Sequence, residues 1–91
     1  MTRADLIEKH KFLFWYMDKS KIHTISDAVV VEFILNYGDI QAVKDLLEVL
    51  GKEQVARIFA ESIKKPRNNY FPQVKNFFHL YFQKNVPEYP F

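Results

Sequence analysis

The distribution of proline and glycine constrains the fold of this sequence more than any other feature. All four prolines lie after residue 65, and the 91 residues include only two glycines, Gly38 and Gly51. Both residue types interrupt or end helices, and a many-turned β fold needs them often. A proline-free first two-thirds with almost no glycine therefore favours an all-α fold. We expect a compact single-domain bundle of about five helices, because a chain of this length fits one core.

The N-terminal segment is predicted to be a helix that begins at Thr2. Thr2 and Asp5 have the spacing of a capping box, with aspartate in place of glutamate. Its buried face would hold Leu6, Ile7, His10, Leu13, Phe14 and Met17. Residues 12–17 are equally consistent with extended chain packed on the core, and residues 18–21 are predicted to form a loop.

Residues 25–37 are predicted to form the central helix. Thr24 and Asp27 repeat the capping spacing, and Gly38 follows the last helical residue. Apolar residues nearly surround this helix, so we expect it to be the most buried one. If the helical prediction fails anywhere, it should fail at residues 28–31, because three of these four residues are valine, a poor helix former.

Three more helices are predicted after Gly38. Asp39 can cap the first, which carries an apolar stripe and ends at Gly51; the second spans residues 52–64; the third begins at Pro72. The inward residues of the last two helices would be Val55, Ile58, Phe59 and Ile63, then Val74, Phe77, Phe78 and Tyr81. Residues 1–85 would form the helical domain. Residues 86–91, with two prolines, are predicted to be an extended tail on the surface.

The residue types that carry most enzyme chemistry are missing or scattered. Cysteine is absent, so neither a disulfide nor a thiolate metal site can form. His10, His23 and His79 show no metal-ligand spacing, and we expect each to be hydrogen-bonded or exposed. The acidic residues have neighbouring lysine or arginine, so paired carboxylates are not indicated, and no phosphate loop or nucleophile motif occurs. We therefore predict a protein that is not an enzyme and binds no cofactor.

Charge and hydropathy set few limits on the partner. The formal charge is +2, which neither demands nor excludes nucleic acid. The first residues lack the apolar region of a signal peptide, and the longest uncharged apolar run, residues 12–17, is far below the ~20 residues of a membrane span. A cytoplasmic protein with no membrane contact is the prediction.

Aromatic residues give the main indication of function. Phe, Tyr and Trp make up 15 of the 91 residues, and they cluster in residues 12–17 and in the C-terminal third. A chain this short buries only about two-thirds of its unfolded surface, so some rings should remain exposed and bind a partner. We expect Trp15, Tyr89 and Phe91 to carry much of that binding, although the tail could instead fold back on its own helices.

Nucleic-acid binding through basic residues and self-association are the two alternatives to binding another protein. The helices on either side of Gly51 could form a helix-turn-helix, but Leu47 and Arg57 occupy positions that favour a small and an apolar residue, so a plain helical hairpin is favoured. Lys64, Lys65 and Arg67 could contact phosphates or an acidic surface, or could simply suit a helix C-terminus. A homo-oligomer that buries its own aromatic patch is the third possibility.

Four motifs in order resemble a family of small, uncharacterised all-helical bacterial proteins often encoded beside AbiE-class nucleotidyltransferase toxins. They are Leu13-Phe14-Trp15 with Asp18 and Lys21-Ile22, then Gly38-Asp39, then Leu50-Gly51-Lys52-Glu53, and finally Asn76-Phe77-Phe78 with Leu80-Tyr81-Phe82. The resemblance covers roughly residues 12–83. This sequence departs from the family at Tyr16, where an acid is frequent, and at Phe78, where tryptophan is frequent.

The resemblance implies a role as an antitoxin or accessory partner of such a toxin, and it implies no catalytic residue. The motifs also have a structural explanation, because the glycines can end helices and the aromatic pairs can pack in the core. Asn76 lies beside the predicted inward face of the last helix, where a buried amide would need partners. The candidates for partner binding are Trp15, Asp18, Arg67, Asn76, Tyr89 and Phe91.

Overall fold

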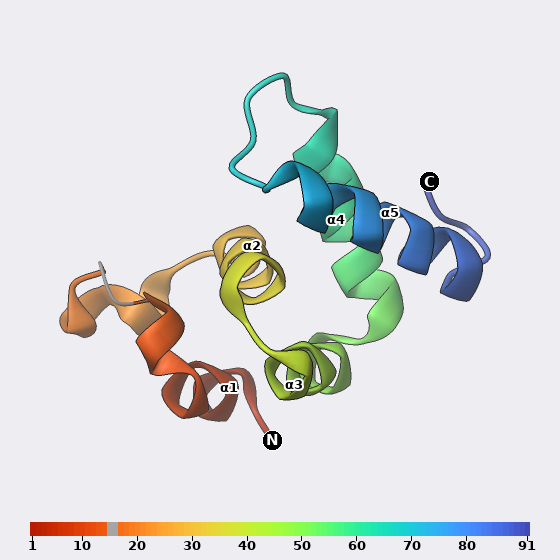
Figure 1. Cartoon of the computed structure of the whole chain (residues 1–91). Helices are drawn as coiled ribbons and strands as arrows, with labels where there is room; N and C mark the ends of the chain where they lie inside the picture. Colours follow the sequence, from red (N-terminus) through yellow and green to blue (C-terminus); the bar gives the residue numbers. More distant parts are fainter. Residues whose placement is uncertain (15–16) are drawn as a thin grey trace.

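The computed structural model describes residues 1–14 and 17–91, and these form an all-α bundle (Figure 1). Its α-helices are α1 (Arg3–Lys9), α2 (Asp27–Tyr37), α3 (Ile40–Leu50), α4 (Lys52–Lys64) and α5 (Pro72–Asn85). Two 3₁₀ helices, η1 (Lys11–Phe14) and η2 (Lys19–Thr24), lie between α1 and α2. No strand occurs in the described residues, and the predicted fold class is confirmed.

Helix α2 is central, as predicted. It packs against α3, α4 and η1, and Val30, Val31 and Ile34 are completely buried (Figure 1). The valine run is therefore helical, because burial on several sides outweighs its weak intrinsic propensity. The predicted cap is wrong: the Ser26 hydroxyl accepts from the amide of Val29, and Thr24 instead donates to the carbonyl of Lys21.

The hairpin of α3 and α4 follows the predicted local signals. The carboxylate of Asp39 accepts from the amide of Ala42 at 2.9 Å and caps α3. Gly51 has φ = 87° between the two helices, a conformation that glycine adopts without the penalty a side chain brings. The carbonyl of Gly51 then accepts from the amide of Val55 at 3.0 Å and begins α4.

The N-terminal segment is helical over a shorter stretch than predicted. The capping box of Thr2 and Asp5 is present, but α1 ends at Lys9 and a 3₁₀ turn follows. The prediction of a loop at residues 18–21 is wrong, because Asp18 caps η2. Its carboxylate accepts from both the amide and the hydroxyl of Ser20, which begins the turn.

Helix α5 begins at Pro72 as predicted, but two predictions about the C-terminal region are wrong. Phe78 and Phe82 are buried, whereas Phe77, predicted to face inward, is 60% exposed. The tail is not an extended surface segment: residues 87–90 form turns, and Val86 and Tyr89 are buried. The domain therefore does not end at residue 85, because the tail completes its core.

Candidate functional site

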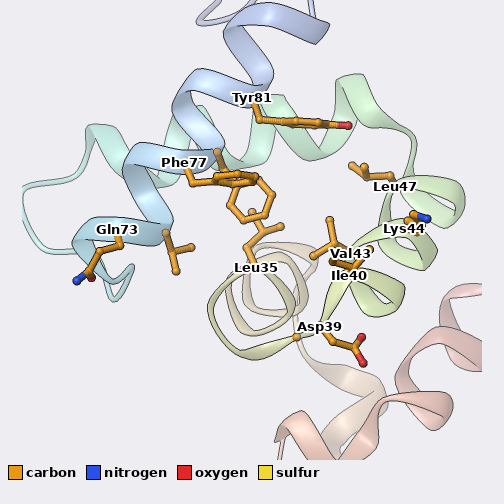
Figure 2. Close-up of a pocket in the computed structure, with 12 residues that line it drawn as sticks. Leu35, Asp39, Ile40, Val43, Lys44, Leu47, Gln73, Phe77 and Tyr81 are labelled. Carbon is orange, nitrogen blue, oxygen red and sulfur yellow. The ribbon is translucent and has the colours of Figure 1, made fainter.

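An apolar groove of about 580 Å³ lies between α3 and α5 and is the main candidate site. Figure 2 shows the rings of Phe77 and Tyr81 on α5 facing Leu35 of α2 and Val43 and Leu47 of α3. The groove has the size of a small-molecule pocket, but most of its lining side chains are aliphatic or aromatic. Such a surface can bury apolar groups and offers little for chemistry.

Two large apolar side chains of the groove remain in contact with water. Ile40 is 74% exposed and Phe77 is 60% exposed. Phe77 is held in place by its neighbours on α5, since it packs edge-on against Phe78 with 5.0 Å between ring centroids and stacks on Tyr81 at 6.4 Å. The groove therefore presents positioned apolar groups that a partner could cover.

The charged residues of the groove differ in what they already bind. Asp39 uses its carboxylate to cap α3, and Figure 2 shows it pointing away from the rings. Lys44 forms no ion pair within the described part of the chain. The groove lining therefore holds one carboxylate that already accepts a hydrogen bond and one ammonium group without an ion-pair partner among the described residues.

Sequence reasoning assigned Phe77 to the core and Ile40 to an apolar stripe, so it missed the groove. A signal was present for Phe77: adjacent residues on a helix point about 100° apart, so on a helix with one buried face the second ring of the Phe77–Phe78 pair need not be buried. Ile40 is the first residue of α3, so it lies at the end of the apolar stripe of that helix. The groove itself is lined by residues of α2, α3 and α5, and no local pattern shows that these helices border one cavity.

The predicted partner-binding residues do not come together in one place. Arg67 is exposed in the connection between α4 and α5, and it lines a polar pocket of about 300 Å³ with Lys65 and Tyr70. Asn76 lies beside the inward face of α5 but is exposed, so its amide needs no protein partner. Asp18 caps η2, which lowers the pKa of its carboxyl group through hydrogen bonds from Ser20. Trp15 lies outside the described residues.

The two tail candidates pack on the chain's own helices. The ring of Tyr89 is 6% exposed, lies near Phe59 and Phe82, and its hydroxyl is 2.8 Å from Nδ1 of His79. Phe91 is 38% exposed and covers the guanidinium of Arg57, with 4.3 Å between the ring centroid and Cζ. At Tyr89 the tail therefore folds back on its own helices, and in this conformation the ring is not accessible to a partner.

The tail also covers part of the helix that would read DNA in a helix-turn-helix. Arg57 on α4 lies beneath Phe91 and forms ion pairs with Glu53 at 3.3 Å and Glu88 at 3.8 Å. A recognition helix must present such side chains to the major groove. The geometry therefore favours the plain helical hairpin over the DNA-binding alternative.

A buried polar network that the sequence did not reveal joins α1 to α3. Asp45 is 3% exposed, and its Oδ2 atom lies 2.8 Å from both Lys9 Nζ and His10 Nε2. Its Oδ1 atom accepts from Gln41 at 2.9 Å. These donors, led by Lys9, hold the pKa of the Asp45 carboxyl group well below its usual range. The cation that pairs with Asp45 comes from α1 and not from a lysine or arginine of α3.

Among the described residues, this network is not joined to a nucleophile. A His–Asp pair activates a nucleophile only when a hydroxyl or thiol lies within reach of the imidazole, and no hydrogen bond of that kind involves His10 in the described residues. His23 pairs with Glu8 at 2.8 Å and His79 with Tyr89, so the described histidines have partners as expected. No group of metal-ligating side chains occurs among the described residues.

No family model, curated protein or solved structure matches this chain. The resemblance to the AbiE-associated family therefore stays a prediction. Within the described residues, no helix combines the length and the apolar character needed to cross a membrane.

Proposed function

We propose that this protein is a non-enzymatic protein-binding module whose groove between α3 and α5 receives a helix of a partner. The groove carries the proposal, because Ile40 and Phe77 expose large apolar surfaces on either side of an apolar floor. Helix-in-groove recognition uses such a channel, and apolar anchors of the incoming helix fill it.

The charge beside the groove selects among amphipathic helices. Lys44 lies at the groove without an ion-pair partner in the described part of the chain, whereas Asp39 is engaged in the cap of α3. A partner with a carboxylate next to its apolar face would pair with Lys44, and a partner with a lysine there would be repelled. The proposed occupant is therefore an amphipathic helix with a carboxylate placed to pair with Lys44.

The resemblance supplies the candidate for the partner, a nucleotidyltransferase-type toxin, which makes an antitoxin or accessory role the specific form of this proposal. The support is the order of the four motifs together with the exposed apolar groove. Co-expression tests it directly: the two proteins should co-purify, and the small protein should restore growth to cells that express the toxin. Absence of both effects would remove the toxin as the partner.

The groove is tested by Phe77→Ser with Leu80→Ser as the matched control. Both residues are exposed on α5, at 60% and 52%, but only Phe77 lines the groove. Phe77→Ser should weaken partner binding by about 2 kcal/mol, roughly 30-fold in Kd, because an aromatic anchor contact is lost. Leu80→Ser should bind normally, and Lys44→Glu should weaken binding in a salt-dependent way.

Sedimentation of the isolated protein distinguishes partner binding from self-association, which is the remaining alternative. A monomer that binds its partner through Phe77 supports the proposal. A dimer that dissociates in Phe77→Ser would instead assign the groove to self-association. Equal losses in Phe77→Ser and Leu80→Ser would contradict a role for the groove itself.

A further inference from the structure

The connection between α2 and α3 consists of two residues, Gly38 and Asp39, and both line the groove. It joins the helix that carries Leu35 to the helix that carries Ile40 and Val43, and Figure 2 shows these three side chains next to one another in the groove. Their relative positions therefore depend on how α3 leaves the end of α2.

The backbone conformation of Gly38 does not require glycine. Its φ is −76° and its ψ is 158°, which any residue can adopt. Gly38 follows α2 as predicted, but it does not have the left-handed conformation that glycine often supplies after a helix. Gly51 at the end of α3 does have that conformation, with φ = 87°. A different property must therefore favour glycine at residue 38.

That property is the close approach of the two helices. A Cβ atom at residue 38 would lie 2.6 Å from the carbonyl oxygen of Ile34 and 2.9 Å from the Cβ atom of Ala42. Nonbonded carbon atoms prefer separations of about 3.5–4.0 Å. Neither neighbour can move away by changing a rotamer, because one is a backbone atom of α2 and the other is fixed to the backbone of α3. Any larger residue must therefore displace one helix from the other.

Both residues of the connection are hydrogen-bonded to the helices that they join. The amide of Gly38 donates to the carbonyl of Ile34 on α2 at 2.8 Å. The carboxylate of Asp39 accepts from the amide of Ala42 on α3 at 2.9 Å, and Ala42 is completely buried. The connection is thus short, bonded at both ends and packed without space for a side chain at Gly38. It fixes where α3 begins relative to α2.

We propose that Gly38 is the positioning residue of the groove, because the missing side chain lets α3 start in direct contact with α2. This contact holds Ile40 and Val43 beside Leu35 before a partner binds. A preformed groove binds more tightly than one that must be ordered by its ligand, since less conformational entropy is lost on binding. The inference rests on the proposed function of the groove and explains why its walls are in place in the free protein.

Gly38→Ala tests this role, with Gly51→Ala as the matched control. Gly51 does not line the groove, and no described atom lies within 4 Å of where its Cβ atom would be. Both variants should lower the melting temperature, the first through the steric clash and the second through backbone strain. Only Gly38→Ala should change the orientation of α3 relative to α2, which residual dipolar couplings of the full chain measure.

Binding is measured with the apolar dye anilinonaphthalene sulfonate, whose sulfonate can pair with Lys44, at a temperature where all variants are folded. The dye should bind Gly38→Ala roughly fivefold more weakly than the unaltered protein, because the groove is no longer preformed. Gly51→Ala should bind it like the unaltered protein. Equal losses in the two glycine variants would overturn the proposal, since reduced stability would then explain both.

Phe77→Ser separates failure of this inference from failure of the groove. Dye binding that falls in Phe77→Ser but is unchanged in Gly38→Ala would overturn only the positioning role of Gly38. Dye binding that is unchanged in Phe77→Ser would contradict the groove as a binding site, and the inference with it. An unchanged orientation of α3 in Gly38→Ala would also overturn the proposal, whatever the dye shows.

Two variants of Asp39 decide the question if Gly38→Ala does not fold. Asp39→Ala removes the bond to the amide of Ala42, whereas Asp39→Ser supplies a hydroxyl that can cap the helix. Both remove the same negative charge, so they affect an anionic dye equally through electrostatics. The dye should bind Asp39→Ser more tightly than Asp39→Ala, because the first turn of α3, with Ile40, stays in place. Equal binding to the two variants would overturn the proposal.

Discussion

The two ends of the chain are attached to the central helices by different kinds of interaction. Helix α1 is joined to α3 through the buried carboxylate of Asp45, which binds Lys9 and His10 at 2.8 Å each. Helix α5 and the tail are joined to α4 by rings around Phe59, with centroid distances of 5.5 Å to Phe82 and 6.5 Å to Tyr89. The N-terminal attachment is polar and directional, and the C-terminal one is apolar.

This difference predicts different responses to solution conditions. The polar attachment depends on the ionised form of one carboxyl group, so acid should weaken it. The aromatic attachment depends on buried area and should respond to the loss of a ring but little to pH. Three substitutions test this contrast, and each has a control that leaves the attachment in place.

The largest effect is expected from Phe59→Ala, which removes the ring at the centre of the aromatic cluster. Phe59 is completely buried and also lies 5.1 Å from Tyr70 between ring centroids. The free energy of unfolding should fall by about 3–5 kcal/mol, because the substitution leaves a cavity. Chemical denaturation measures this, and Phe77→Ala, at an exposed ring, should change stability by less than about 0.5 kcal/mol. Similar losses in both variants would contradict the assigned core.

A smaller effect is expected from Tyr89→Ala, which tests whether the tail belongs to the core. Loss of its buried ring should cost about 1.5–3 kcal/mol of unfolding free energy. Tyr89→Phe keeps the ring and removes only the contact with His79, so it should cost less. Unchanged stability together with lost partner binding would instead restore the predicted interface role of Tyr89.

The smallest effect at neutral pH is expected from Asp45→Asn, but it should be the one that depends on pH. The pKa of Asp45 is lower in the folded protein than in the unfolded chain, chiefly because of the hydrogen bond from Lys9. Its contribution is therefore complete above the unfolded value of about 3.9 and is lost as the pH falls below it. The melting temperature should drop by roughly 5 °C at pH 7, since a change of this size is typical when a small domain loses a stabilising contact.

Thermal melts from pH 7 to pH 2 measure this dependence. The difference between the two proteins should stay constant above about pH 5 and narrow below about pH 4. Glu48→Gln is the control, because it removes a carboxylate from an exposed position on the same helix. A difference for Asp45→Asn that does not change with pH would show that shape, and not charge, holds α1 on α3.

Local signals predicted most of the secondary structure because each acts within a few residues. The cap at Asp39, the left-handed Gly51 and the first-turn Pro72 all lie where helix ends were predicted, since their effects depend only on nearby backbone groups. The wrong prediction of Thr24 in place of Ser26 as the cap of α2 also concerns a local signal. Thr24 and Ser26 both offer a hydroxyl near the start of α2, and the path of the preceding η2 decided which one caps it.

The candidate sites were less predictable, because they join segments that are distant in the sequence. The basic character of Lys65 and Arg67 is visible in the sequence, but the pocket that they line with Tyr70 forms only once α2 and α4 meet. The groove depends in the same way on α2, α3 and α5 bordering one cavity. The cationic partner of Asp45, Lys9, comes from α1, and no spacing within α3 indicates it.

The sequence by itself thus determined the helical class, the number of helices and where most of them end, because proline, glycine and capping residues act on the adjacent backbone. Only the tertiary structure decided which aromatic side chains are buried. Phe77 is exposed while Phe78 is buried, and Tyr89 enters the core although it lies between two prolines of the tail, Pro87 and Pro90. Burial depends on which surfaces meet across the bundle, and that is a property of the whole chain.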